Sequence, residues 1–295
     1  MTYPDLHGIF PYLVSPVNAD GSVREEALRK LTEHLIQCGV HGLTPLGSTG
    51  EFFYLTWQQK REIVRIVLDQ TAGRVPVVPG VGCSSVQESV FQAREFEKMG
   101  VDGILSVLTV YFPLGQDEIY RYFAETAKAV SCQIVLYNNP KFTGFDLSVE
   151  TLVRLAELPN VTYYKDASFN TGKLLQLSSQ VGDRLKIFSA SAHVPVFISM
   201  LGGVGWMSGP ACLIPRESVA LYELCAARKW DEAMPLQRRL WTLNTAFQKY
   251  GLAACIKAGL TLQGFDVGDP IPPIRPLGSE ATEDIRTVLE RIGAL

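Results

Sequence analysis

The stretch Ile134-Val135-Leu136-Tyr137 is apolar at successive positions, and the turn-forming residues Asn138-Asn139-Pro140 follow it directly. A strand with one solvated face alternates apolar and polar residues, whereas a strand covered on both faces is apolar throughout. The stretch therefore predicts a buried strand of a parallel sheet that ends where the asparagines begin.

Similar apolar, β-branched runs occur on both sides of this stretch, and amphipathic segments of helical period lie between them. With 133–137 itself, the runs are 8–14, 42–46, 75–81, 103–107, 161–165, 185–189 and 204–208. The helical segments include 25–38, 56–70, 86–99 and 119–130. A doubly wound open sheet normally uses fewer strands, so eight repeated strand–helix units favour an α/β fold of the (β/α)₈ TIM-barrel type.

Helix boundaries are marked by residue type. Thr56 and Ser85 each precede a helical segment and have Gln or Glu three residues later, which is the capping-box pattern. Glycines at 39, 73 and 100 end three of these segments. Beyond the eighth unit, 230–262 and 280–292 read as further helices, separated by the proline-rich 269–276. We therefore expect a catalytic barrel at 1–227 and a C-terminal helical extension at 228–295.

The composition excludes several classes of function. Hydrophobic residues make up 47% and charged residues 19%, which suits a chain with a sizeable core. A net charge of -3 gives no general attraction to nucleic acid or anionic lipid. The N-terminus lacks a secretion signal and the six cysteines form no C-x-x-C pair, so we expect a cytoplasmic protein with reduced core thiols.

Catalytic groups of such barrels lie at the carboxyl ends of strands. Lys165 ends the run 161–165. A lysine inside a barrel mouth loses hydration when charged, which lowers its pKa and leaves a free amine for attack on a carbonyl. The alternative is a strand-end lysine whose ammonium group simply reaches water, and the strand alone favours that alternative.

Two further segments could share the mouth with Lys165. Tyr137 ends the neighbouring run about 4.8 Å away and could move protons, although a buried aromatic side chain with a bonded hydroxyl is an equal alternative. Gly47-Ser48-Thr49-Gly50 offers backbone amides and hydroxyls to a carboxylate, but such a loop is often only a turn. The sequence has no zinc-binding histidine spacing, no dinucleotide glycine motif and no Walker loop, so neither a metal nor another cofactor is expected.

Taken together and in this order, the three segments resemble the dihydrodipicolinate synthase / N-acetylneuraminate lyase family of Schiff-base-forming class I aldolases. The sequence matches the family's G-[ST]-T-G-E loop at 47–51, its Y-N-x-P-x-x-T-G segment at 137–144 and its lysine strand end at 164–168. The resemblance implies that Lys165 forms an imine with a 2-oxo acid and that Tyr137 relays protons. Gly47, Ser48 and Thr49 would bind the carboxylate, with Thr143 in the adjoining segment.

The sequence also departs from the family pattern. Dihydrodipicolinate synthases have an arginine five residues after the relay tyrosine, which binds the distal carboxyl of the second substrate, and here that residue is Phe142. In the family's synthases, a tyrosine from a neighbouring subunit takes part in the proton relay. The position of that tyrosine aligns with Phe112 in this sequence, and Tyr111 is adjacent to it. At 189–193, Ser-Ala-Ser-Ala-His replaces a segment that carries carboxylates in the family, which leaves Ala190 as the substrate-side residue there.

These features favour a lyase or aldolase that joins pyruvate or another 2-oxo acid to an uncharged or aromatic aldehyde. The alternatives are a dehydratase or aldolase of 2-oxo-3-deoxy sugar acids, and a barrel that binds a 2-oxo acid without turnover. The expected partners are small molecules, with no nucleic acid and no membrane. The resemblance implies a homotetramer built as a dimer of dimers, in which Tyr111 lies in the loop that meets a neighbour.

Overall fold

The computed structural model describes residues 3–190 and 194–295 of the chain. These residues group into two compact units. The first unit contains the segment up to residue 7 and residues 78–207, and the second contains residues 8–77 and 208–295.

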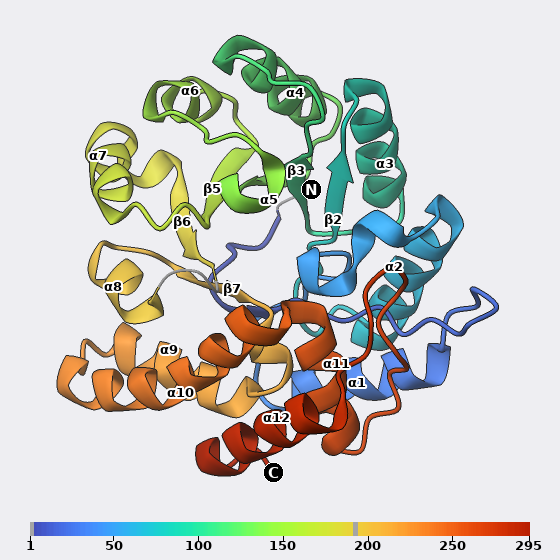
Figure 1. Cartoon of the computed structure of the whole chain (residues 1–295). Coiled ribbons are helices and arrows are strands. Elements are labelled where there is room, and N and C mark those ends of the chain that lie inside the picture. Colours follow the sequence, from blue (N-terminus) through green and yellow to red (C-terminus); the bar gives the residue numbers. More distant parts are fainter. Residues whose placement is uncertain (1–2, 191–193) are drawn as a thin grey trace. The chain divides into compact units, whose positions relative to one another are not determined.

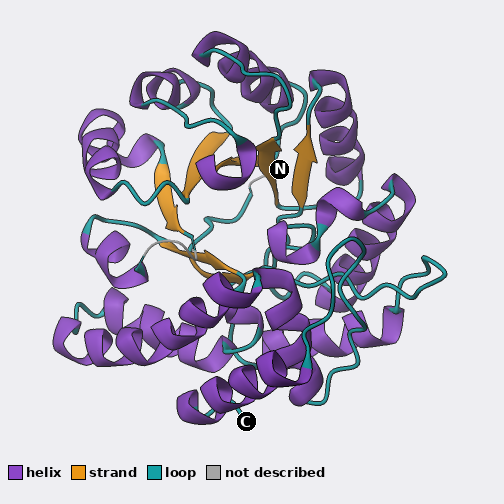
Figure 2. Cartoon of the chain, viewed as in Figure 1, coloured by secondary structure: helices purple, strands orange, loops and turns teal. Residues whose placement is uncertain are grey.

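In the first unit, at least one helix separates each strand from the next. Figure 2 shows the helices in purple and the strands in orange. The elements in chain order are β2 (Gly80–Cys83), α3 (Val86–Lys98), β3 (Gly103–Leu108), α4 (Gln116–Lys128), β4 (Gln133–Asn138), α5 (Pro140–Thr143), α6 (Val149–Leu155), β5 (Val161–Asp166), α7 (Thr171–Val181), the 3₁₀ turn η3 (Gly182–Arg184), β6 (Lys186–Ser189), α8 (Pro195–Met200) and β7 (Gly205–Ser208).

Strands β2 to β7 pair in the order in which they occur in the sequence, and the pairs that join β2 through β7 are parallel. Parallel neighbours need a crossover connection, which the helices supply. Helices α3, α4, α6 and α7 lie along one side of this arc of strands (Figure 1). Every residue of β3 is buried, as are nearly all residues of β4 and β5, which confirms the prediction of strands covered on both faces.

The second unit holds the start of the sheet and the long C-terminal helices. Its elements are β1 (Gly8–Pro11), α1 (Glu25–Gln37), the 3₁₀ turns η1 (Ser48–Gly50) and η2 (Phe52–Tyr54), α2 (Trp57–Thr71), the 3₁₀ turn η4 (Pro210–Cys212), α9 (Pro215–Ala226), α10 (Trp230–Tyr250), α11 (Leu252–Leu262) and α12 (Ser279–Ile292). The single helix predicted over 230–262 is divided into α10 and α11, because Gly251 at φ 90° leaves the helical conformation.

The capping box predicted at Thr56 is confirmed, whereas at Ser85 the structure shows only the bond to the serine side chain. The Thr56 hydroxyl accepts from the Gln59 amide at 3.3 Å, and the Gln59 side chain accepts from the Thr56 amide at 2.8 Å. Ser85 Oγ accepts from the Glu88 amide at 3.2 Å. These bonds satisfy amides that a helix cannot pair internally, so the sequence defines where α2 and α3 begin.

Two predicted strand runs differ from the structure because of prolines. The run 75–81 pairs as a ladder only from Gly80, since Pro76 and Pro79 have no amide hydrogen to donate. The run 42–46 forms isolated parallel bridges, Leu43 with Val77 and Thr44 with Tyr12, rather than a ladder. Pro45 has no amide hydrogen to donate to a neighbouring strand. Leu46 adopts a positive φ of 60°, so the chain leaves the extended conformation there.

Other predictions concern the chain as a whole. The six cysteines are buried free thiols, as predicted. The expected boundary between 227 and 228 falls between α9 and α10, and a catalytic domain ending there stays a prediction. Within residues 3–190 and 194–295, each helix is too short or too polar to cross a lipid bilayer.

Candidate active site

Lys165 and Tyr137 are register partners on adjacent parallel strands, β5 and β4. Paired positions in a parallel sheet direct their side chains to the same face. Lys165 Nζ lies 3.9 Å from the centre of the Tyr137 ring, and the two residues are only 3% and 4% exposed. The structure therefore brings together the amine and the phenol that the sequence singled out.

Burial governs the protonation of this lysine. It lowers the pKa of Lys165 well below the ordinary value of 10.5, because an ammonium group loses its hydration there. The phenol beside it is held in place, since Asn139 Nδ2 donates to Tyr137 Oη at 2.8 Å. The pair thus combines an amine whose pKa is lowered by burial with a hydroxyl that accepts a hydrogen bond from Asn139.

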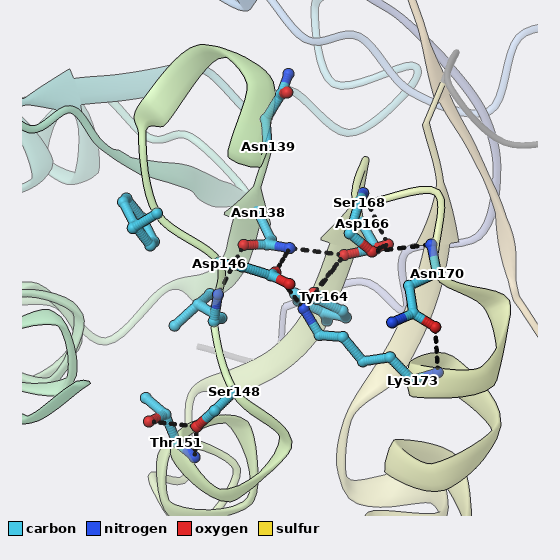
Figure 3. Close-up of polar contacts among 12 residues, drawn as sticks. Asn138, Asn139, Asp146, Ser148, Thr151, Tyr164, Asp166, Ser168, Asn170 and Lys173 are labelled. Carbon is cyan, nitrogen blue, oxygen red and sulfur yellow. Dashed lines mark hydrogen bonds and ion pairs between the residues drawn. The ribbon is translucent and has the colours of Figure 1, made fainter. Parts of the chain in front are cut away.

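A second polar cluster lies at the same ends of β4 and β5 (Figure 3). Asn138 Nδ2 donates to Asp146 Oδ1 at 2.7 Å and to Asp166 Oδ1 at 2.8 Å. Lys173 Nζ, from α7, lies 2.5 Å from Asp146 Oδ1 and 3.9 Å from Asp166 Oδ1. The Tyr164 hydroxyl donates to Asp166 Oδ1 at 2.5 Å. A fully buried carboxylate is thereby compensated by hydrogen bonds and a cation.

Successive residues of a strand point to opposite faces, so Lys165 and its neighbour Asp166 face apart. The arrangement keeps a carboxylate within the strand end without placing it beside the amine. Burial, and after it the charge of Asp166, raises the pKa of Tyr164 well above its usual range. Tyr164 therefore stays a neutral hydrogen-bond donor to the carboxylate.

The glycine-rich loop belongs to the second unit and forms η1. A Cβ at Gly47 would lie 2.3 Å from the Tyr12 ring, so no larger residue fits there. The side chain of Thr49 is fully buried, and among the described residues its hydroxyl has no hydrogen-bond partner. Buried polar groups are nearly always bonded, so this hydroxyl is available to a bound water or ligand.

The loop is anchored by a buried ion pair that the sequence reasoning missed. Glu51 Oε2 lies 2.7 Å from Lys257 Nζ of α11, with both side chains essentially unexposed. Glu51 Oε1 accepts from the Ile271 amide at 2.6 Å, and Lys257 Nζ donates to the carbonyls of Ser15 and Asp269. Lys257 is the one charged residue of the helix Leu252–Leu262, whose other residues are apolar except for Thr261, and this signal could have identified it.

The remaining predicted residues occupy different environments. Thr143 is buried and its hydroxyl donates to the Asn139 carbonyl at 2.9 Å, and Ala190 is also buried. Phe142 is 62% exposed on α5, and Tyr111 is 89% exposed, with its ring 5.0 Å from that of Phe112 in an edge-to-face pair. The predicted departure at 189–193 lies partly outside the described residues, since these end at 190 and resume at 194.

Comparison with known proteins gives a consistent result. A family model described as the dihydrodipicolinate synthetase family matches residues 5–292. The 4-hydroxy-tetrahydrodipicolinate synthase of Methanopyrus kandleri is 32% identical over 98% of this chain and 97% of its own. A crystal structure of a putative dihydrodipicolinate synthetase from Pseudomonas aeruginosa, 31% identical, has a TM-score of 0.94 and covers 98% of this chain and 100% of its own.

A third relative is the dihydrodipicolinate synthase of Acinetobacter baumannii, whose structure was determined in complex with pyruvate. It is 26% identical, has a TM-score of 0.93 and covers 98% of this chain and 99% of its own. The fold and these matches define an enzyme of the class I aldolase/lyase type, pyruvate-dependent and similar to dihydrodipicolinate synthase. The chain belongs to the dihydrodipicolinate synthetase family.

The Glu51–Lys257 pair gives the first prediction. Lys257→Met leaves a buried, unpaired carboxylate and should lower the free energy of unfolding by about 3–5 kcal/mol, measured by chemical denaturation. The double variant Lys257→Met/Glu51→Gln is the matched control, because it removes both charges and should recover most of the loss. An unchanged stability of the single variant would show that the pair does not hold the loop.

The burial of Lys165 gives a prediction about pH. The pKa of Lys165 is lower in the folded chain than in the unfolded chain, so between the two values the unfolded chain binds the extra proton. Lys165 therefore destabilises the fold below its unfolded pKa, and this cost fades as the pH rises toward 10.5. Lys165→Met should therefore have a higher free energy of unfolding than the parent at pH 7, and this difference should become small near pH 10.5.

The control is Lys98→Met, because the side chain of Lys98 is 71% exposed. Denaturation midpoints of the parent and both variants are compared across the pH range. The account of Lys165 is contradicted if Lys165→Met has no advantage at neutral pH, or if its advantage does not change with pH.

Proposed function

We propose that Lys165 forms an imine with a 2-oxo acid such as pyruvate, and that the enzyme joins this unit to an uncharged or aromatic aldehyde or cleaves the corresponding product. The observation that carries the proposal is the buried Lys165 amine, 3.9 Å from the centre of the Tyr137 ring and with a lowered pKa. A neutral amine beside a phenol provides both the nucleophile and the acid–base group that imine formation needs.

The proposed sequence begins when Lys165 Nζ attacks the ketone carbon to form a carbinolamine. Tyr137 delivers a proton to the hydroxyl, which leaves as water and gives a protonated imine. This cation draws electrons from C3, so loss of a C3 proton gives an enamine. The enamine carbon then bonds to the aldehyde carbon, the aldehyde oxygen takes a proton, and water hydrolyses the imine to release a 4-hydroxy-2-oxo acid and restore the amine.

The pyruvate complex of the Acinetobacter baumannii relative supports pyruvate as the first substrate. For its carboxylate we propose Ser48 and Thr49, on the match of their loop to the family and on the unpaired Thr49 hydroxyl. Thr143, Ala190 and Tyr111 stay predicted substrate contacts.

The second substrate is inferred from Phe142. An exposed phenyl ring takes the place of the arginine that binds a distal carboxylate in the family's synthases. A ring gives a carboxylate no compensation for its lost hydration, whereas it packs well on an uncharged or aromatic group. This difference favours a neutral aldehyde over a charged one.

Three broader statements are part of the same proposal. The run 42–46, which bridges to Tyr12 and Val77, supports the completion of a closed (β/α)₈ barrel. The family resemblance and the exposed Tyr111–Phe112 pair support a homotetramer, which light scattering can measure. The cytoplasmic location stays a prediction from the composition of the sequence.

Borohydride trapping tests the proposed imine. The enzyme incubated with pyruvate and borohydride should gain one covalent adduct, which peptide mass spectrometry should locate at Lys165. The buried Lys173 and Lys257 should remain unmodified, and Lys165→Met should give no adduct. A stable adduct at another lysine, or none on the parent enzyme, would exclude the mechanism.

Phe142→Arg tests the second substrate. A bidentate arginine contact to a carboxylate is worth about 10²- to 10³-fold in selectivity, so this variant should gain activity with aspartate semialdehyde relative to a neutral aldehyde. Phe142→Leu is the matched control, because it changes the ring without adding charge. Efficient condensation of pyruvate with aspartate semialdehyde by the parent enzyme would contradict this interpretation of Phe142.

A further inference from the structure

Phe169 combines three features that a purely structural residue would not need. It lies four residues after Lys165, in the segment between β5 and α7. Its backbone has φ 63°, in the left-handed region that favours glycine or asparagine. Its side chain is 60% exposed.

These features oppose the stability of the fold. A β-carbon in the left-handed region is strained, and an exposed phenyl ring regains only a fraction of what burial would contribute. Glycine at this position would satisfy the backbone without strain. Strained residues that the surrounding structure holds in place gather at functional sites, which makes Phe169 a candidate for a functional role.

The surrounding hydrogen bonds show how the strain is maintained. Asp166 Oδ2 accepts from the amide and the hydroxyl of Ser168, at 3.0 and 2.5 Å. Ser168 Oγ accepts from the Asn170 amide at 3.2 Å. Asn170 Oδ1 in turn accepts from the Lys173 amide at 3.0 Å and caps α7 (Figure 3). Both neighbours of Phe169 are therefore fixed, and its backbone cannot relax without breaking this chain of bonds.

The same cluster also holds the segment that carries Phe142. Asn138 and Asp166 are register partners at the ends of β4 and β5, and their side chains are hydrogen-bonded. Helix α5, with Phe142, begins two residues after Asn138, and Phe169 follows Asp166 by three. Two exposed phenyl rings thus lie on the segments that follow the paired ends of β4 and β5, the strands that carry Tyr137 and Lys165.

We propose that Phe169 is a specificity-determining residue whose ring contacts the apolar or aromatic part of the aldehyde substrate. The assignment rests on the proposed function and deepens it, since it names a contact for the second substrate rather than for the 2-oxo acid. The cluster around Asp166 is what presents the ring, so Asp166 and Ser168 are positioning residues. Aromatic contacts of this kind select for ring-bearing ligands over small ones.

The experiment compares the parent enzyme with Phe169→Gly, using pyruvate with benzaldehyde or with acetaldehyde. The variant should lower kcat/KM for benzaldehyde by about tenfold, with a much smaller change for acetaldehyde. Its melting temperature should not fall, because glycine relieves the positive φ. A residue with a merely structural role would show the opposite pattern, with reduced stability and an unchanged preference between the aldehydes.

Two control variants sharpen the test. Phe169→Leu keeps the strain and an apolar side chain but loses the ring, so it should fall between the parent and Phe169→Gly in preference for benzaldehyde. Phe91→Ala removes another exposed phenyl ring, 44% exposed on helix α3, and should leave that preference unchanged. An equal loss in Phe91→Ala would show that the effect is not specific to this site.

If neither aldehyde reacts, the dissociation constant of benzyl alcohol is measured instead, with the parent and the variant both loaded with pyruvate. Phe169→Gly should bind benzyl alcohol about tenfold more weakly than the parent. An unchanged preference and unchanged binding in Phe169→Gly would overturn the inference. Borohydride trapping on the same preparations separates the two proposals. A missing adduct at Lys165 rejects the proposed function, whereas an intact adduct with an unchanged preference rejects only the role of Phe169.

Discussion

The burial of Lys165 within a parallel sheet is the constraint on which the proposed chemistry depends. A strand covered on both faces places its end residues in a medium that penalises charge, so burial lowers the pKa of the Lys165 amine. The register of β4 and β5 then places a phenol directly beside it. The proposed nucleophile and the proposed acid–base group are thus both positioned by the pairing of two apolar strands.

The residue after Lys165, Asp166, is a buried carboxylate whose charge must be compensated. Asp166 is a fully buried carboxylate one residue from the amine, and its charge would be costly if it were left alone. Asn138, Tyr164 and Ser168 donate to it, and the ammonium group of Lys173 lies within 3.9 Å. Through its bonds to Ser168, the carboxylate fixes the segment that follows the strand.

Much of this was predictable from the sequence, because apolar runs define buried parallel strands and Tyr137 and Lys165 end two of them. The two prolines before Gly80 and the break at Gly251 are equally visible in the sequence, but their effect depends on which donors a neighbouring segment needs. Asp146, Lys173 and Lys257 were missed because their partners are distant in sequence or lie in separate segments. Local sequence patterns predict which residues are buried. Which buried charged side chains contact one another depends on the three-dimensional fold.

The most direct test of the central claim is the pH dependence of imine formation at Lys165. The rate of the first step with pyruvate can be followed by rapid mixing and borohydride quenching across the pH range in which the protein stays folded. A buried, neutral amine predicts a rate that rises and levels off at a pH well below 10.5. A rate that keeps rising until the pH approaches 10.5 would show an ordinary, hydrated ammonium group at Lys165 and would contradict the account.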